Sequence, residues 1–188
     1  WYNTLTKQYP SDYRAVNNLA QLAIANGDLA TAKQYLEKAR SINKSASEVN
    51  TNLGLMAIKS GDVNAAETYL AAGSGANTFN EVMGALNIAK GNYTQAAANM
   101  KGATSNAAAL AQILAKDYSS AKNTLNAIKK ADATTSYLKA ILAARTGDAN
   151  ALATNLKSAI QQDATLATRA AKDLEFANYA STIKELVK

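Results

Sequence analysis

The sequence lacks cysteine and histidine, and it contains a single proline. These absences exclude disulfides, thiolate and imidazole metal ligands, cysteine nucleophiles and serine–histidine pairs. Glycine is also scarce, with 9 residues among 188, whereas alanine supplies 42. Because alanine has the lowest cost of any residue in a helix, this composition predicts an all-α protein. It also argues against an enzyme, because the side chains that most often carry catalysis are missing.

The net charge is small and is not concentrated in one block of the chain. Lys and Arg number 20 against 14 Asp and Glu, which gives a net charge of +6. The densest basic run is the pair Lys129-Lys130, whereas a nucleic-acid surface carries clustered basic residues interleaved with aromatic ones. Apolar runs are far shorter than the ~20 residues that a membrane span needs. We therefore expect no nucleic-acid partner and no insertion of this chain into a membrane.

A short turn motif recurs along the chain and divides it into repeats. It occurs as Gly27-Asp28, Gly61-Asp62, Gly91-Asn92 and Gly147-Asp148, with Lys116-Asp117 in the same role. An alanine-rich helical stretch precedes each motif and a second amphipathic stretch follows it. Glycine permits the positive φ that ends a helix, and the Asp or Asn side chain can cap the next helix. Each repeat is therefore predicted to be two antiparallel helices joined by a tight turn.

Each predicted helix has one apolar face, and small residues occur where two helices would meet. The first helix has Val16, Leu19, Ala20, Ala23 and Ile24, and the second has Leu29, Ala32, Tyr35, Leu36 and Ala39. The small residues are Ala20, Ala32, Gly54, Ala66, Gly84 and Ala96. One helix pair cannot bury its face alone, so we expect the pairs to stack and share a continuous core.

This pattern, with a spacing of 34 residues between the first two turns, resembles the tetratricopeptide repeat family. In the first repeat the matching residues are Val16, Leu19, Ala20, Ala32, Leu36, Ala39 and Ile42. The chain departs from the family pattern in two ways. The large aromatic residues of the first helix are replaced by smaller ones, such as Ala23 and Ala57, and the closing proline of each repeat is absent. The resemblance implies a right-handed α-solenoid of antiparallel helix pairs, a TPR-like superhelix.

The resemblance also suggests how the chain is organised. Residues 11–161 would form about five helix pairs, and residues 162–188 would form C-terminal capping helices. We expect one helical stretch with Leu166, Ala170, Leu174, Phe176 and Tyr179, and a last helix from Tyr179 to Val187. Pro10 falls where an earlier repeat would close, so residues 1–10 are interpreted as the remnant of a truncated repeat in a longer protein. A natural N-terminal capping helix is the alternative.

No motif in the sequence carries an obvious chemistry. The glycine-rich segment 71–77 lacks the lysine and the preceding strand of a phosphate-binding loop, so it is interpreted as a connection between repeats. The carboxylates are spaced as helix caps and outer-face residues rather than as pairs for acid–base catalysis or as a calcium loop. The sequence therefore predicts no catalytic residues, no metal site and no cofactor.

Proteins of this family usually bind ligands on the concave face made by the first helices of the pairs. The resemblance therefore implies binding residues at the corresponding positions, each of which could equally be part of a solvated helix face. These residues are Arg14, Asn17, Gln21, Thr51, Lys59, Asn106, Tyr137 and Arg145. The Lys and Asn clamp with which some members bind a C-terminal carboxylate is absent.

These features favour a non-enzymatic module for protein–protein or protein–peptide interaction within a larger protein. The alternative is a structural spacer or dimerisation arm of a bacterial cell-envelope protein, and a homodimer stays open as its assembly state. A composition rich in alanine, asparagine, threonine and serine is similar to that of extracytoplasmic bacterial repeat proteins. This similarity favours the cell envelope, in the periplasm or associated with the outer membrane, over the cytoplasm.

Overall fold

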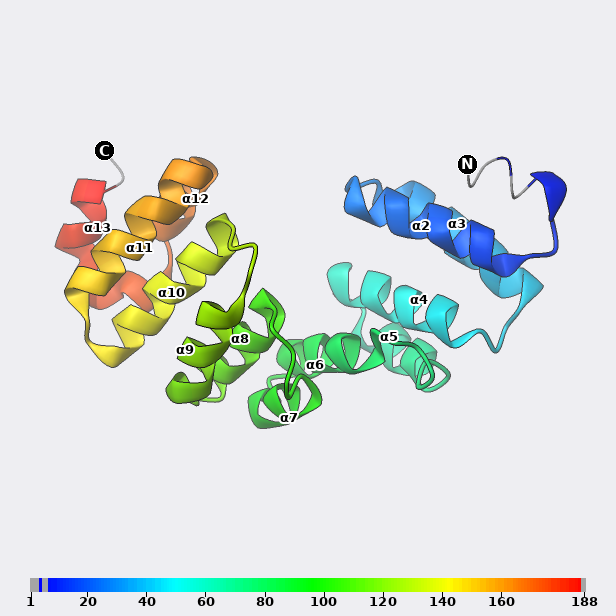
Figure 1. Ribbon diagram of the computed structural model, residues 1–188, viewed down its shortest axis with the longest axis horizontal. Coiled ribbons are helices and arrows are strands. Elements are labelled where there is room, and N and C mark those ends of the chain that lie inside the picture. The colour runs from blue at the N-terminus through cyan, green and yellow to red at the C-terminus, as the bar shows by residue number, and fades with distance from the viewer. Residues whose placement is uncertain (1–3, 5–6, 187–188) are drawn as a thin grey trace. The chain divides into compact units, whose positions relative to one another are not determined.

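The computed structural model of the chain is built from helices and contains no strand among the residues that it describes, which are Thr4 and 7–186 (Figure 1). The chain divides into two compact units, Trp1–Asn99 and Met100–Lys188. The all-α fold class expected from the composition is confirmed. The interpretation of residues 1–10 as the remnant of a repeat stays a prediction, and residues 1–3 and 5–6 lie outside the described residues.

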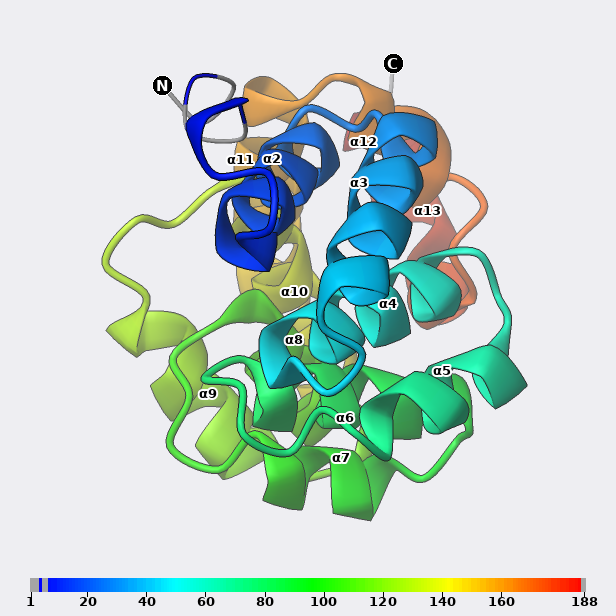
Figure 2. The same cartoon turned by 90° about the vertical axis from the view of Figure 1, so that its right-hand side faces the viewer.

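The first unit contains three helix pairs in its described part. They are α2 (Tyr13–Ala25) with α3 (Leu29–Ile42), α4 (Ser47–Lys59) with α5 (Val63–Leu70), and α6 (Phe79–Ala89) with α7 (Tyr93–Asn99). The two helices of each pair pack against each other, and α2 and α3 lie side by side in both views (Figure 2). The first helix of the second pair, α4, also packs against α2 and α6, so the pairs share a core as the repeat pattern predicts.

The second unit contains two helix pairs and three short C-terminal elements. The pairs are α8 (Asn106–Leu114) with α9 (Tyr118–Ala127) and α10 (Ala133–Thr146) with α11 (Ala149–Gln162). They are followed by α12 (Thr165–Ala170), a 3₁₀ helix η1 (Leu174–Tyr179) and α13 (Ala180–Leu186). The 3₁₀ helix η1 packs on α10, and both α12 and α13 pack on α11.

The prediction of one helical stretch with Leu166, Leu174 and Tyr179 on one face is wrong. The chain breaks after α12, and Leu174 is 88% exposed rather than buried. The physical reason is a new helix start, because the Asp173 side chain accepts a hydrogen bond from the backbone N–H of Glu175 at 3.0 Å. Phe176, from the same prediction, does lie in the core. Val187, at the end of the predicted last helix, lies outside the described residues.

The predicted turns are confirmed. The four turn glycines have φ between +77° and +81°, and Lys116, which stands in for glycine in the fourth repeat, has φ of +63°. The following side chain caps the next helix in four repeats: Asp28, Asp62, Asp117 and Asp148 each accept a backbone N–H at 2.9–3.1 Å. These bonds satisfy N–H groups that the first turn of a helix leaves free.

Small residues lie where the helices of a pair approach each other closely, as predicted. Ala20, Ala32, Ala66 and Ala96 are all completely buried. At Gly54 a Cβ atom would lie 2.7 Å from the Cγ atom of Leu70, which is closer than two carbon atoms can pack. Glycine at this position therefore lets α4 and α5 come together without displacing the Leu70 side chain.

Candidate interaction surfaces

Three of the residues predicted to bind ligands lie in the interior rather than on an open face. Asn17, Thr51 and Tyr137 are 5%, 0% and 2% exposed. The Oδ1 atom of Asn17 accepts a hydrogen bond from Asn52 at 2.8 Å, and Thr51 donates its hydroxyl to the carbonyl of Gly73 at 3.0 Å. The prediction that these residues are on an open surface is wrong, because each one contacts the next part of the helical stack.

Tyr137 is covered by the C-terminal elements of its own unit. Its ring makes an edge contact with Phe176, with 5.6 Å between ring centroids, and its hydroxyl donates to Asp173 at 2.7 Å. The guanidinium of Arg169 lies 4.9 Å from the ring centroid, a cation–π distance. Burial raises the pKa of Tyr137 well above its ordinary value, and the Asp173 carboxylate raises it further. Tyr137 is therefore a packed structural residue here.

Arg145 is engaged by the same C-terminal elements. It forms a two-point ion pair with Glu175, and its Nη1 atom donates to the carbonyl of Ile113 at 2.9 Å. The Glu175 carboxylate raises the pKa of Arg145 above its ordinary value. Because the guanidinium joins α8, α10 and η1, it has few donors left for a ligand.

Asn106 belongs to a polar network at the start of α8 and α10. Its amide donates to Asp132 at 3.0 Å, and its carbonyl accepts from the Thr135 hydroxyl at 2.9 Å. Asp132 and Thr135 also cap α10 reciprocally, which holds the pKa of Asp132 below its ordinary value through the backbone N–H of Thr135. This network ties the two first helices of the second unit together.

The other three predicted binding residues, Arg14, Gln21 and Lys59, are exposed and all belong to the first unit. Arg14 is held by Asp12, with its Nε and Nη2 atoms 2.9 and 2.8 Å from the carboxylate oxygens. Next to Gln21, the side chain of Leu22 is 50% exposed. The structure thus places an exposed apolar residue on α2 that the sequence pattern did not single out.

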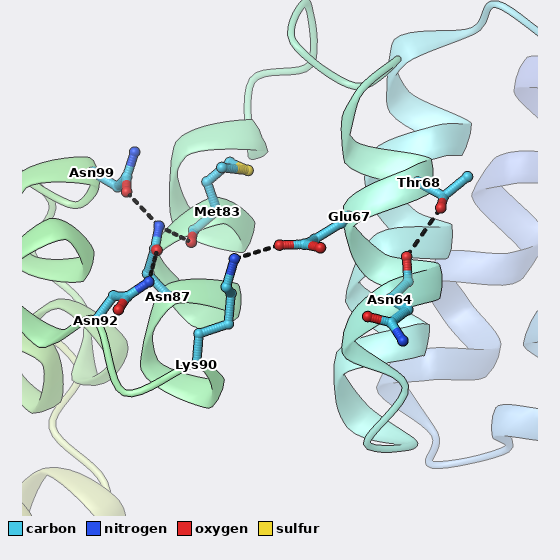
Figure 3. Close-up of polar contacts among 8 residues, drawn as sticks. All are labelled: Asn64, Glu67, Thr68, Met83, Asn87, Lys90, Asn92 and Asn99. Atoms are coloured by element: carbon cyan, nitrogen blue, oxygen red, sulfur yellow. Dashed lines mark hydrogen bonds and ion pairs between the residues drawn. The ribbon is translucent and has the colours of Figure 1, made fainter.

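The sequence pattern also did not reveal a cluster of asparagine side chains in the first unit (Figure 3). The buried Asn87 amide donates to the Met83 carbonyl at 3.1 Å and to Asn99 Oδ1 at 3.0 Å, and Asn92 donates to Asn87 at 3.4 Å. Lys90 at the end of α6 pairs with Glu67 on α5. The neutral amides satisfy one another inside the repeat, so this cluster is a structural device rather than an open site.

Two grooves occur where the second helix of one pair meets the next pair. In the first unit, a groove of about 290 Å³ includes Arg40, Leu53 and Tyr69. In the second unit, a groove of about 330 Å³ lies between α9, α10 and α11. Its lining consists of Tyr118, Lys122, Asn126, Lys139, Leu142, Ala143, Thr146, Asp148, Ala151 and Asn155.

Comparison with known proteins identifies the repeats. Residues 23–86 match the family model of the tetratricopeptide repeat. These residues carry the tetratricopeptide repeat pattern. Its fold is similar to the crystal structure of PilW, described as a widely conserved type IV pilus biogenesis factor, with a TM-score of 0.66 and 17% identity. That alignment covers 95% of this chain and 87% of the PilW chain.

A second solved structure is a tetratricopeptide repeat protein from Parabacteroides merdae. It has a TM-score of 0.65 and 15% identity, and the alignment covers 99% of this chain and 73% of that one. None of the curated proteins compared with the chain matches it in sequence. At these identities the likeness shows a shared fold of stacked helix pairs.

Tetratricopeptide repeats are interaction scaffolds and are generally not enzymes. In the described part of the chain, no three acidic side chains gather in a group that could hold a metal ion. None of the helices in that part is both long enough and apolar enough to cross a membrane. The exposed side chains and the grooves of these repeats are the candidate sites for binding a partner.

Proposed function

We propose that this chain is a non-enzymatic scaffold that binds a protein or a peptide. The observation that carries the proposal is the tetratricopeptide repeat match over residues 23–86, which falls on helix pairs that stack in the first unit. Stacked pairs give a rigid framework, because each pair is held by its neighbours. A preorganised surface of this kind reduces the entropy lost when a partner binds.

The binding surface that we propose for the first unit lies on α2 and α4. Gln21 and Leu22 on α2 and Lys59 on α4 are the exposed residues that carry it. Leu22 offers apolar area, whereas Gln21 offers an amide that can pair with a peptide backbone. Arg14 contributes less, because Asp12 already occupies its guanidinium.

We further propose that the scaffold works in a bacterial cell envelope. The support is the likeness to PilW, whose description names type IV pilus biogenesis. The partner would then be a protein of an envelope assembly rather than a small molecule. Detection of the tagged full-length protein in separated cytoplasmic and envelope fractions tests this location. Recovery in the cytoplasmic fraction alone would contradict it.

A binding selection tests the scaffold proposal directly. The purified chain is immobilised and exposed to a phage library of random 12-residue peptides, and enriched peptides are synthesised and titrated. Enrichment of related peptides with micromolar affinity is expected.

A triple variant, Gln21→Ala with Leu22→Ser and Lys59→Ala, should lower the affinity for peptides bound by the first unit at least tenfold. Gln34→Ala with Lys38→Ala, on the exposed side of α3, is the matched control. A chain that enriches no peptide above a blank surface contradicts the proposal.

A structural spacer or dimerisation arm is the second candidate. The observation that favours it is the covering of Tyr137 and Arg145 by Asp173, Phe176 and Glu175, which closes the predicted face in the second unit. Light scattering over a range of concentrations separates the two functions. A dimer that forms without ligand, together with a failed peptide selection, supports the arm, whereas a monomer that binds peptides supports the scaffold.

A further inference from the structure

The groove between α9, α10 and α11 has a counterpart in the first unit, between α3, α4 and α5. Counted from the turn glycines Gly61 and Gly147, Leu53 and Lys139 occupy one equivalent position, eight residues before the turn. Tyr69 and Asn155 occupy another, eight residues after it. The two grooves can therefore be compared at these positions, although the rest of their linings differ.

The first-unit groove has a similar volume of about 290 Å³, but its own side chains cover its apolar wall. Leu53 is 3% exposed, and the guanidinium of Arg40 lies 5.4 Å from the ring centroid of Tyr69. This contact places a cation on the face of an aromatic ring and covers the apolar wall of the groove. Glu37 and Lys44 also line the groove, so it has one acidic and two basic side chains. Of the two basic ones, Arg40 is engaged by the Tyr69 ring and by the Asn50 Oδ1 atom, to which its Nε donates at 3.4 Å.

The second-unit groove has neither of these large side chains, leucine or tyrosine, at the equivalent positions. Lys139 replaces leucine at a position that is buried in the first unit, and it is half-buried here. Asn155 replaces tyrosine, and its amide donates to the Ala151 carbonyl at 2.7 Å, which leaves its own carbonyl oxygen available. A half-buried lysine packs its aliphatic stem against the groove while its ammonium reaches solvent. At the rim of a groove such an ammonium is placed to meet a charged group of a partner.

The charge of the groove is complementary to an acidic ligand. Lys122 on α9 and Lys139 on α10 both line it, and among the described residues neither forms an ion pair. Asp148 is the acidic residue in the lining, and its Oδ1 atom already accepts the N–H of Ala151 at 2.9 Å. Leu142 and Ala143 give the groove an apolar wall. Two lysines beside an apolar wall match a carboxylate next to an aliphatic side chain.

We propose that this groove binds an extended peptide segment through an Asp or Glu side chain adjacent to an apolar residue, with Lys139 selecting the carboxylate. A volume of about 330 Å³ is at the lower end of the range for ligand pockets, ~300–1,000 Å³, and suits a few side chains rather than a folded domain. This inference rests on the proposed scaffold function and names the chemistry of one partner.

Three acetylated peptides test this inference against the full chain labelled with ¹⁵N. The acidic probe is acetyl-Gly-Glu-Leu-Glu-Gly-amide, and the neutral probe has glutamine in place of both glutamates. The third probe is the neutral sequence with a free C-terminal carboxylate. Only the acidic probe is expected to shift the backbone amide signals of Lys122, Lys139 and Asn155 at millimolar concentration. Lys139→Gln should weaken its binding at least tenfold, while Lys157→Gln, an exposed lysine on α11 outside the groove, should change it less than twofold.

A second variant, Lys139→Leu, installs the residue found at the equivalent position in the first unit. This variant should also lose the preference for the acidic probe over the neutral one. A spectrum with the signal dispersion of the folded chain would exclude loss of structure as the cause. Equal binding of the acidic and neutral probes, or stronger binding of the free carboxylate, overturns the inference. No shift by the acidic probe overturns it too. In each of these cases, peptides recovered by the phage selection would leave the scaffold function standing, whereas failure of that selection would remove it.

Discussion

The buried polar contacts on the first helices differ between the two units. On α2 and α4 of the first unit these contacts are neutral: Asn52 donates to Asn17, and Thr51 donates to the Gly73 carbonyl. On α10 of the second unit charged groups take part, because Arg145 pairs with Glu175 and Tyr137 donates to Asp173. Neutral amide pairs do not respond to pH or salt, whereas ion pairs and phenol–carboxylate bonds do. These particular contacts should therefore differ in their sensitivity to pH and salt, although the first unit also has ion pairs elsewhere, such as Lys90 with Glu67.

One repeat position shows this difference most clearly. Asn17, Thr51 and Tyr137 all lie ten residues before their turn glycine, and all three are buried. In these three repeats the position contacts neighbouring parts of its unit, whereas Glu81, at the same position of the third repeat, is exposed. Its neighbour also differs: Asn17 meets Asn52 on α4, Thr51 meets Gly73 in a connecting segment, and Tyr137 meets Asp173 and the 3₁₀ helix η1.

The largest expected effect comes from a matched pair of core truncations, Leu36→Ala and Leu156→Ala. Both leucines lie nine residues after their turn glycine and are completely buried. Each substitution should lower the free energy of unfolding of its own unit by about 2–5 kcal/mol, the usual cost of removing a buried leucine side chain and leaving a cavity.

Hydrogen exchange followed by NMR measures this effect unit by unit. Leu36→Ala should accelerate exchange in α2 to α5, and Leu156→Ala should accelerate it in α10 and α11. The exposed control Lys157→Ala should leave both patterns unchanged. Equal acceleration throughout the chain by either leucine variant would show that the two units unfold as one, contrary to the comparison.

The sequence was sufficient to predict what depends on neighbours in the chain. The positive φ of Gly27, the cap at Asp28 and the burial of Ala20 and Ala32 follow from local conformation and helical periodicity. Even Lys116, a lysine in a glycine position, was predicted from its spacing and the aspartate after it. These features are set within one helix pair.

The candidate site could not be predicted in the same way, because exposure depends on segments far away in the sequence. Tyr137 is covered by Asp173 and Phe176, which are more than 30 residues downstream. Thr51 is covered by Gly73, in a segment that has no regular pattern. One signal was present in the sequence: Lys139 stands where the repeat pattern has leucine, and this departure marks the groove.

The next effect compares a neutral contact with a charged one. Asn52→Ala removes the donor of the buried Asn17 carbonyl, and it should cost about 1–3 kcal/mol of stability because a buried acceptor is left without a partner. Arg145→Met removes an ion pair whose side chains are 22% and 27% exposed, so solvent reduces its cost to about 1 kcal/mol.

Salt separates the two variants further. In urea titrations at 0.05 and 1 M sodium chloride, the destabilisation caused by Arg145→Met should shrink at high salt, whereas that of Asn52→Ala should not change. Glu175→Gln serves as the reciprocal control for the ion pair. If Asn52→Ala showed the stronger dependence on salt, the assignment of neutral chemistry to the first unit would be wrong.

An alkaline titration isolates Tyr137. Because burial raises its pKa in the folded state above the value of about 10 in an unfolded chain, its contribution is fully present below pH 10 and is lost as the pH rises toward the folded value. The loss of unfolding free energy between pH 9 and 11 should therefore be smaller in Tyr137→Phe than in the unmodified chain. Tyr93→Phe, at an exposed tyrosine of the first unit, is the control and should leave the loss unchanged.

The smallest expected effect lies at the helix caps, where the two units should agree instead of differing. Hydrogen bonds from Thr31 hold the pKa of Asp28 below its ordinary value, and Ser120 does the same for Asp117. A carboxylate whose pKa is lowered in the folded state stabilises the fold at pH values above its unfolded-state pKa of about 4. This stabilisation is lost as the pH falls through the folded-state pKa.

Asparagine accepts the same capping bond without a titrating proton. Asp28→Asn and Asp117→Asn should thus keep their stability at pH 7 and lose less than the unmodified chain between pH 4 and 2 in thermal unfolding. Glu185→Gln, which removes an exposed carboxylate that caps no helix, should preserve the full acid loss. If only one of the two aspartates flattened the profile, the shared turn chemistry of the repeats would not extend across both units.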